Sequence, residues 1–360
     1  MTESRRAFLH ELVDIDGRTG LEIGPLDRPL VEPAVEGKER KISYLDHLST
    51  EGLRQKYGAD ESVDTDKIVE VDFICPDGDI LKAVGDQTFD YIVASHVVEH
   101  VPNPIQWLKD LFQILNPGGM LFLVVPDKRF TFDIQRPLTT FGQMVEAYLN
   151  KRSIPPVSAV YDQFSSAMSV DGGGVWAGSM NSENVLPMGT STDAWAAAQD
   201  VHANQAYYDV HVSIFTPWSF FEVIRKLIQN GILYCQVGGF SDTLPGQIEF
   251  MVGLKKPEAV TDARADTCIA SIPRLPFESF MAPYMQQVHS LSESYHKLTA
   301  TLTETNELLH KANFSLAQER ERSEHIHDLL RKANAEKEAI FRSRSLRLAR
   351  RLSRYLNFWR

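Results

Sequence analysis

The stretch FDYIVASHVVEHVPNPIQWLKDLFQILNPGGMLFLVV, residues 89–125, combines a strand, a turn, an amphipathic helix and a second strand. Its first seven and last six residues are rich in apolar side chains, as is typical of buried strands. Between them, apolar residues recur at helical spacing until Asn116-Pro117-Gly118-Gly119 ends the helix. A strand, a crossover helix and a second strand in this order predict neighbouring parallel strands.

The same alternation extends along the chain and predicts an α/β fold with an open, mostly parallel sheet that helices cover on both faces. A second helix is expected to begin at the cap Thr216 and to end at Gly231. In such a sheet, ligands bind beyond the carboxyl ends of the strands. The seven expected strands are residues 19–23, 41–46, 67–73, 89–95, 120–125, 232–237 and 247–254.

Polar residues follow these strands and predict a binding site along one edge of the sheet. Gly24 would let a ligand approach the backbone, because a Cβ there would obstruct it. An acidic residue after the second strand suits a pair of ribose hydroxyls, since a carboxylate can accept both hydrogen bonds. The polar groups of this edge are Glu22, Gly24, Asp46, Asp72, Ser95 to His100, and Asp127 to Arg129.

These motifs together resemble those of the class I S-adenosylmethionine-dependent methyltransferases, a family with a seven-stranded Rossmann-like sheet. The resemblance implies S-adenosyl-L-methionine as the cofactor. The first turn, GPLDRP, departs from the family by having a single glycine. The motifs are LEIGP (21–25), YLDHLS (44–49), VDF (71–73), FDYIVASHVVEHVPNP (89–104) and LNPGGMLFLVVPDKRFTFD (115–133). By resemblance, the cofactor-binding residues are Glu22 and Gly24 at the methionine part, Asp46 at the ribose, Asp72 and Phe73 at the adenine, and Ser95 and His96 at the methyl donor.

The string HVVEH (96–100) also fits the inverted zinc-protease pattern H-x-x-E-H. Two histidines four residues apart share a metal only on a stable helix, but His96 comes directly after a strand and Pro102 follows His100 closely. The sequence offers no recognisable third ligand. We therefore predict no metal site and interpret the string as the post-strand motif of the methyltransferase family.

The acceptor side of the site is expected from His100, His211 and the segment that follows the fifth strand. His100 and His211 are candidate catalytic bases because histidine exchanges protons near neutral pH, while a structural role is the alternative for His100. PDKRFTFDIQRPLTT (126–140) and YYDVHVSIFTPWSF (207–220) resemble a methyltransferase subgroup associated with bacterial surface-polysaccharide pathways. The substrate-binding candidates are Asp127, Arg129, Asp133 and Arg136, whose alternative role is in salt bridges and caps that fix the loop.

The chain is expected to divide into a methyltransferase domain at 1–258, a linker at 259–284, a coiled coil at 285–341 and a basic amphipathic tail at 342–360. Within the domain, residues 137–215 form an insertion without a clear helix or strand pattern. An insertion of this size beside a binding edge is expected to act as a lid or an acceptor site. Its aromatic residues either stack on a sugar or anchor the insertion.

The region 285–341 keeps hydrophobic residues at steps of three and four for about seven heptads, which predicts a coiled-coil homo-oligomer. The near repeats ELLHKAN (307–313) and DLLRKAN (328–334) lie three heptads apart and support this phase. The number of chains in the coil stays open.

The tail has seven arginines and no acidic residue, whereas the whole chain has a net charge of −11. Its apolar and basic residues separate onto two helical faces, which favours binding to an anionic membrane surface over nucleic acid or a solvated helix. The first 17 residues contain no signal-peptide pattern, and no window reaches the roughly 18 apolar residues of a membrane span. We therefore expect a cytoplasmic protein that the tail attaches peripherally to the inner face of the membrane.

Two classes of function follow from the sequence. The favoured one is an S-adenosylmethionine-dependent methyltransferase that O-methylates a sugar or glycan, with another small molecule as the alternative acceptor. The other is a degenerate methyltransferase fold that serves as a coiled-coil scaffold. The retained acidic residues at the cofactor edge favour the enzyme, and the missing G-x-G-x-x-G turn disfavours a nicotinamide dehydrogenase.

Overall fold

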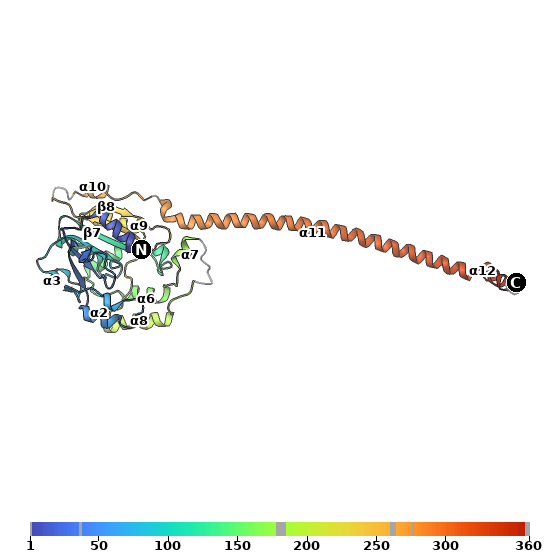
Figure 1. Cartoon of the computed structure of the whole chain (residues 1–360), viewed down its shortest axis with the longest axis horizontal. Helices are drawn as coiled ribbons and strands as arrows, with labels where there is room; N and C mark the ends of the chain where they lie inside the picture. Colours follow the sequence, from blue (N-terminus) through green and yellow to red (C-terminus); the bar gives the residue numbers. More distant parts are fainter. Residues whose placement is uncertain (1, 36–37, 178–184, 260–263, 276, 357–360) are drawn as a thin grey trace. The chain divides into compact units, whose positions relative to one another are not determined.

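The computed structural model describes residues 2–35, 38–177, 185–259, 264–275 and 277–356 (Figure 1). The chain divides into two compact units, Met1–Gln286 and Gln287–Arg360.

Within the described residues of the first unit, seven strands form one sheet in the order β5-β4-β1-β6-β7-β9-β8. A separate two-stranded ribbon pairs β2 (Ala34–Val35) with β3 (Lys38–Glu39). The strands of the main sheet are β1 (Thr19–Ile23), β4 (Lys41–Asp46), β5 (Phe73–Ile74), β6 (Phe89–Ser95), β7 (Leu115–Pro126), β8 (Gln236–Ser241) and β9 (Glu249–Lys255).

The seven-stranded α/β sheet is confirmed, but it is mixed and not mostly parallel as we expected. Strands β5, β4, β1, β6 and β7 pair in parallel, whereas β9 is antiparallel to both β7 and β8. The physical reason is the short connection from Ser241 to Glu249, since parallel neighbours need a crossover of about a dozen residues or more.

The third expected strand, residues 67–73, is the one that differs most in length. Strand β5 covers only Phe73–Ile74, and a 3₁₀ turn, η1 (Thr65–Lys67), occupies the start of the expected segment. The Asp72 side chain accepts a hydrogen bond from the Tyr44 amide at 2.8 Å, so it anchors this edge of the sheet to β4.

Alternating residues of the central strands supply two hydrophobic cores, one on each face of the sheet, as the strand period of two requires. Ile92 and Ala94 of β6 contribute to the core that α3, α4 and α9 cover. Tyr91 and Val93 of the same strand contribute to the core that α1 covers. The helices of this unit outside the insertion are α1 (Thr2–Leu12), α2 (Thr50–Tyr57), α3 (Ile80–Val84), α4 (Pro104–Ile114), α9 (Pro217–Gln229) and α10 (Ala265–Ala270).

The insertion contains helices that its sequence pattern did not predict. Helices α6 and α8 pack on one another (Figure 1) and share a small core that includes Val160 and Val201. Three of the four buried residues of α8 are alanines, so this helix lacks the large apolar stripe by which helices are recognised in sequence. The insertion helices are α5 (Phe141–Leu149), α6 (Val157–Ser166), α7 (Gly172–Trp176) and α8 (Ser191–Asn204), and a 3₁₀ turn, η2 (Lys128–Phe130), precedes them.

The expected linker, 259–284, is partly structured. Helix α10 contacts α9 and β8, and Cys268 and Ile272 join the core of the first unit. Helix α11 begins at Phe277, inside the expected linker, and runs to Arg342.

The expected coiled-coil region lies in α11, a single helix of 66 residues, and its hydrophobic positions are exposed. The side chains of the seam positions Val288 and Leu291 lie outside the described residues. Exposed positions of the stripe include Tyr295, Leu298, Leu302, Leu309, Leu316, Ile326, Leu330 and Ile340.

The basic tail forms the helix α12 (Arg344–Leu356), and residues 357–360, which include Trp359, lie outside the described residues. Leu348 and Leu352 of α12 are 61% and 56% exposed. Among the described residues, every helix is too short or too polar to cross a membrane.

Candidate active site

The parallel half of the sheet brings the expected cofactor residues to one edge. Ile23, the last residue of β1, is in register with Leu45 of β4 and Ala94 of β6. Gly24, Asp46 and Ser95 therefore lie at the carboxyl ends of three adjacent strands. The ordered row of polar groups inferred from the sequence is a real feature of the fold.

Glu22 shapes the loop that follows β1. Its side chain is 2% exposed, and its two carboxylate oxygens accept hydrogen bonds from the Leu30 amide at 2.7 Å and the Val31 amide at 3.0 Å. Burial raises the pKa of Glu22 to about 7, although the two amides and nearby Arg6 act to lower it. Its contact with a cofactor stays a prediction.

Gly24 has a φ of +64°, a left-handed conformation that glycine adopts without strain. Its amide donates to the Leu45 carbonyl at 2.9 Å, and a Cβ at this position would meet Val97 at 3.4 Å. The turn with one glycine thus keeps the backbone open where a ligand would approach.

Asp46 retains acceptor capacity at the end of β4. Its Oδ1 accepts from the His47 amide at 2.7 Å and pairs with His47 Nδ1 at 2.6 Å. Both contacts that the described chain makes with this carboxylate fall on Oδ1, so Oδ2 can accept from a ribose hydroxyl. Phe73, expected beside the adenine, packs edge-on against Phe89.

Ser95 and His96 belong to a network that the sequence analysis did not include. Arg5 of α1 forms a bidentate pair with Glu249 of β9, with both N–O distances at 2.6 Å. His96 Nε2 lies 2.7 Å from the same carboxylate, and Arg5 Nη1 donates to Ser95 Oγ at 3.4 Å. Arg5 and Glu249 lie 244 positions apart, and no local motif marks them, so only the folded chain reveals them.

The turn after β6 is strained at His96, which has a φ of +55°. Burial acts to lower the pKa of His96, but the carboxylates of Glu249 and Glu99 raise it to about 9. Burial acts to raise the pKa of Glu249, but its partners His96 and Arg5 lower it to about 2. This side of the turn therefore holds a charged imidazole between carboxylates.

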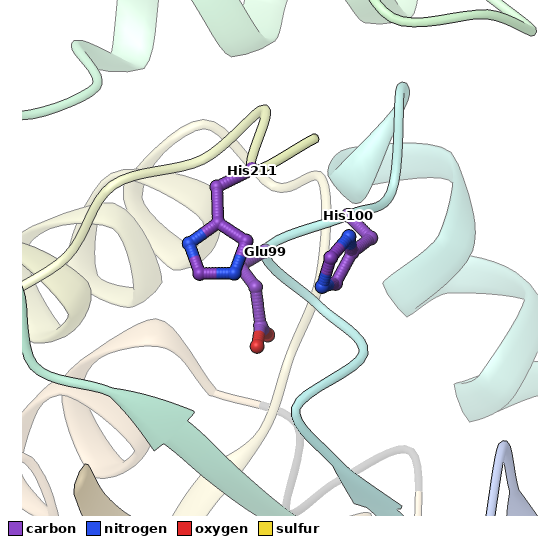
Figure 2. Close-up of side chains that lie close together, drawn as sticks. All are labelled: Glu99, His100 and His211. Carbon is purple, nitrogen blue, oxygen red and sulfur yellow. The ribbon is translucent and has the colours of Figure 1, made fainter. Parts of the chain in front are cut away.

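The other side of the turn carries Glu99 and His100, which meet His211 from the segment before α9 (Figure 2). One ligand-type atom of each side chain lies within 4.8 Å of the others. The two imidazole rings pack edge to face with centroids 4.7 Å apart. The Glu99 carbonyl accepts from the amides of Val212 and Ser213 at 2.6 and 3.0 Å, which ties the two segments together.

Each imidazole of this cluster is backed by a carboxylate. His211 Nδ1 donates to Asp133 Oδ2 at 2.5 Å, and His100 Nδ1 lies 2.8 Å from Asp209 Oδ1. Burial acts to lower the pKa of His100, but Asp209 and then Glu99 raise it above its ordinary value. The structure thus brings together the two histidines that we selected as candidate bases.

The four expected substrate-binding residues are engaged within the protein. Arg129 pairs with Asp127 through Nε and Nη2, and the shortest distance is 2.6 Å. Arg136 donates to Asp133 at 2.8 Å and to the His211 carbonyl at 2.8 Å. These contacts agree with the alternative role of fixing the loop, and a role in acceptor binding stays a prediction.

Residues 3–167 match the family model described as a methyltransferase domain. This segment, which is less than half of the chain, is therefore similar to a methyltransferase domain, in agreement with the motifs. This segment contains the predicted cofactor edge from Glu22 to His96.

Curated relatives match over a short segment. A ubiquinone biosynthesis O-methyltransferase of Parvibaculum lavamentivorans is 42% identical over 53 residues, which are 15% of this chain and 21% of the relative. A mitochondrial protein of the same description from Dictyostelium discoideum is 33% identical over 79 residues, 22% of each chain. This chain thus spans about a fifth of the length of these relatives.

Solved structures of methyltransferases share less sequence identity with this chain than the curated relatives do. An S-adenosylmethionine-dependent methyltransferase from Mesorhizobium loti has a TM-score of 0.37 and 11% identity, and the match covers 69% of this chain and 96% of that one.

Proposed function

We propose that this protein transfers the methyl group of S-adenosylmethionine to a hydroxyl oxygen of a sugar or glycan in cell-surface polysaccharide biosynthesis. The observation that carries the proposal is the pair of carboxylate-backed imidazoles, His100 and His211, beside the carboxyl end of β6. A methyltransferase needs such groups only for an acceptor that must lose a proton.

The chemistry explains why the acceptor is assigned as a hydroxyl. The acceptor oxygen bonds to the methyl carbon while the carbon–sulfur bond breaks and its electron pair stays on sulfur. The cofactor supplies the activated methyl group, so the protein aligns the reactants and excludes water. A carboxylate or an amine attacks without a strong base, whereas a hydroxyl must be activated. Two imidazoles can do so by accepting its proton or by holding a cation that lowers its pKa.

Two further features support an oxygen acceptor of the sugar type. The curated relatives are described as O-methyltransferases, and the segments 126–140 and 207–220 resemble the polysaccharide-associated subgroup. Tyr207 is 57% exposed and lies two residues before Asp209, so its ring is available to stack on a sugar. By contrast, Trp176 stacks on Phe130 with centroids 4.3 Å apart and anchors the insertion.

The test is transfer of labelled methyl from S-adenosylmethionine to a panel of nucleotide sugars and lipid-linked glycans. We expect a methyl ether on one class of acceptor, and Tyr207→Ala should raise its KM with a smaller effect on kcat. Trp195→Ala, which removes a ring that is 61% exposed at the start of α8, is the matched control. Transfer only to amines or carboxylates would contradict the proposal, and failure to bind S-adenosylmethionine would favour the scaffold alternative.

The C-terminal region supports a proposal on assembly. The exposed apolar stripe of α11 suits pairing with further copies of this chain, because a lone helix would leave these side chains in water. Light scattering of the full chain should give an integral oligomer, and polar replacements such as Leu302→Glu and Leu309→Glu should produce monomers. A monomeric parent chain would contradict the assembly.

The tail is proposed to bind an anionic membrane surface. Helix α12 has arginines in every turn and exposed leucines, which together suit the headgroup layer. Flotation should be strong with anionic vesicles, weak with neutral ones, and lost in a chain that ends at Ile340. Equal flotation of both chains, or binding to duplex DNA in place of vesicles, would contradict this assignment.

A further inference from the structure

The Glu99 side chain is the least expected feature of the cluster. It is 0% exposed, and among the described residues neither carboxylate oxygen has a hydrogen-bond partner. His96 Nδ1 lies 3.4 Å from Oε1, at an ion-pair distance without hydrogen-bond geometry. The His96 ion pair compensates part of this buried charge, but both oxygens still lack a hydrogen-bond donor and can accept a further cation.

The imidazoles of His100 and His211 can bind the same cation as the Glu99 carboxylate. Asp133 pairs with Nδ1 of His211, and Asp209 lies at an ion-pair distance of 2.8 Å from Nδ1 of His100, so Nε2 of each ring can offer its lone pair to a cation. Figure 2 shows Glu99 and His100 on one segment and His211 reaching them from another. Metal-ligating histidines almost always have their second nitrogen on a carboxylate, a carbonyl or water, which fixes the tautomer and the ring orientation.

We propose that Glu99, His100 and His211 bind one divalent first-row transition-metal ion, with Asp133 and Asp209 orienting the two imidazoles. Two imidazoles and one carboxylate suit Zn²⁺, Mn²⁺ or Fe²⁺ better than Mg²⁺ or Ca²⁺, which prefer oxygen ligands.

The cluster must contract slightly when it binds the ion. Ligand bonds of about 2.1 Å put two ligand atoms at most about 4.2 Å apart, whereas the present separations reach 4.8 Å. Small side-chain rotations are sufficient for this change.

The site differs from the zinc-protease pattern that the string 96–100 matches. His96 is not a ligand, because its Nε2 pairs with Glu249, which Arg5 also binds. The third ligand is His211, which lies 111 positions beyond His100 in the chain. Two of the three proposed ligands, Glu99 and His100, therefore come from the string. The third ligand, His211, is brought to them by the fold.

Three protein ligands leave coordination positions open, as in catalytic metal sites. If the acceptor is a hydroxyl compound, its oxygen can occupy one of these positions, and the cation lowers the pKa of that hydroxyl. The proton then leaves to solvent, and the bound oxygen attacks the methyl carbon as the sulfur departs with the bonding electrons. This consequence rests on the proposed function, whereas binding of the ion does not.

The test is metal binding by the full chain, with no acceptor present. After dialysis against a chelator, the chain is titrated with Zn²⁺, Mn²⁺ and Mg²⁺ by calorimetry, and its metal content and thermal stability are measured. We expect one Zn²⁺ or Mn²⁺ per chain, a raised melting temperature, and far weaker binding of Mg²⁺.

Three variants and a control define the site. Glu99→Gln keeps the side-chain volume and should abolish stoichiometric binding, as should His211→Ala. Asp133→Asn should weaken binding by about 10- to 100-fold, the usual effect of a partner that orients a ligand. His202→Ala removes an exposed histidine at the end of α8 and should bind like the parent. Circular dichroism and S-adenosylmethionine binding confirm that each variant is folded.

Two outcomes would overturn the site. The first is the absence of stoichiometric metal in the parent chain. The second is equal binding by the parent and Glu99→Gln, which would place the ion on surface histidines such as those of α11. If the ion binds as expected but no sugar hydroxyl is methylated, the metal site stands and the proposed function fails.

Discussion

Two buried carboxylates in adjacent turns of this protein have opposite surroundings. Asp127, after β7, is 0% exposed, and Arg129 and the Thr243 hydroxyl donate to it. Glu99, after β6, is also 0% exposed, yet neither of its oxygens has a hydrogen-bond partner in the described part of the chain. The fold supplies hydrogen-bond donors to the first carboxylate, whereas the second has only the ion pair with His96 at 3.4 Å.

The difference separates structural from functional groups at the same edge of the sheet. A buried carboxylate that is paired stabilises one conformation of its loop, and removing its partner is costly. A buried carboxylate that has an ion pair but no hydrogen-bond donor, as Glu99 has with His96, is less firmly held and keeps its oxygens available to a ligand. Glu22, with two amide donors, and Asp46, with one oxygen occupied, lie between these extremes.

Removing the partner of the completed carboxylate should have the largest effect. We expect Arg129→Met to lower the free energy of unfolding by about 3 to 5 kcal/mol, because the Asp127 charge then remains buried without its cation and keeps only hydrogen bonds such as that from Thr243. The control is Arg264→Met, whose pair with Asp266 is exposed to solvent and screened, so we expect a much smaller loss than in Arg129→Met. Urea unfolding measures both, and equal effects would remove the distinction between the two pairs.

Glu22 should make stability depend on pH. Its pKa rises from 4.5 to about 7 on folding, so the folded chain binds more protons than the unfolded chain in this interval. The resulting stability is fully present below pH 4.5 and is lost as the pH rises through about 7, by about 3 kcal/mol.

The measurement is urea unfolding across this range for the parent chain and for Glu22→Gln, which does not titrate. If the free energy of unfolding of Glu22→Gln changed with pH as much as that of the parent chain, the pH dependence would belong to other groups.

Asp46 tests the case of a carboxylate with one oxygen occupied. Asp46→Ala should weaken S-adenosylmethionine binding by about 1.5 to 3 kcal/mol, the range for a hydrogen bond to a charged group. Calorimetry with S-adenosylhomocysteine gives the same comparison without turnover. Asp77→Ala, at an exposed site near α3, is the control, and parent-like affinity in Asp46→Ala would exclude Asp46 from the ribose site.

The smallest effect is expected at Glu99 itself. In metal-free protein, Glu99→Gln should lower the free energy of unfolding by only about 1 kcal/mol, because the amide loses the ion pair with His96 but no hydrogen bond. Asp127→Asn is the matched change and should destabilise by about 1 to 3 kcal/mol. A larger loss in Glu99→Gln than in Asp127→Asn would reverse the comparison.

The sequence predicted which residues meet at one edge of the sheet because they follow strands that have strong local signals, whereas their contact with a cofactor stays a prediction. Gly24, Asp46 and Ser95 end three apolar runs, and parallel pairing then brings them together. The direction of β9 was not predictable in this way, since an apolar run looks the same in either orientation.

Long-range contacts account for the rest of what the sequence did not reveal. Neither Arg5 nor Glu249 lies in a motif, and their pairing depends on how α1 crosses the sheet. We predicted no metal site because the string 96–100 lacked a third ligand. His211 could be selected as a histidine near the acceptor, but its approach to Glu99 follows from the path of the insertion.

The pair between Arg5 and Glu249 also sets the order in which the site can mature during synthesis. The partner of Arg5 is made 244 residues after it. At about 5 to 20 residues per second, this delay is on the order of 10 to 50 seconds. Throughout that time the parallel strands can assemble while α1 and the strained His96 turn lack the carboxylate that joins them. The network of Arg5, Ser95, His96 and Glu249 is therefore one of the last parts of this unit to reach its final form on the nascent chain.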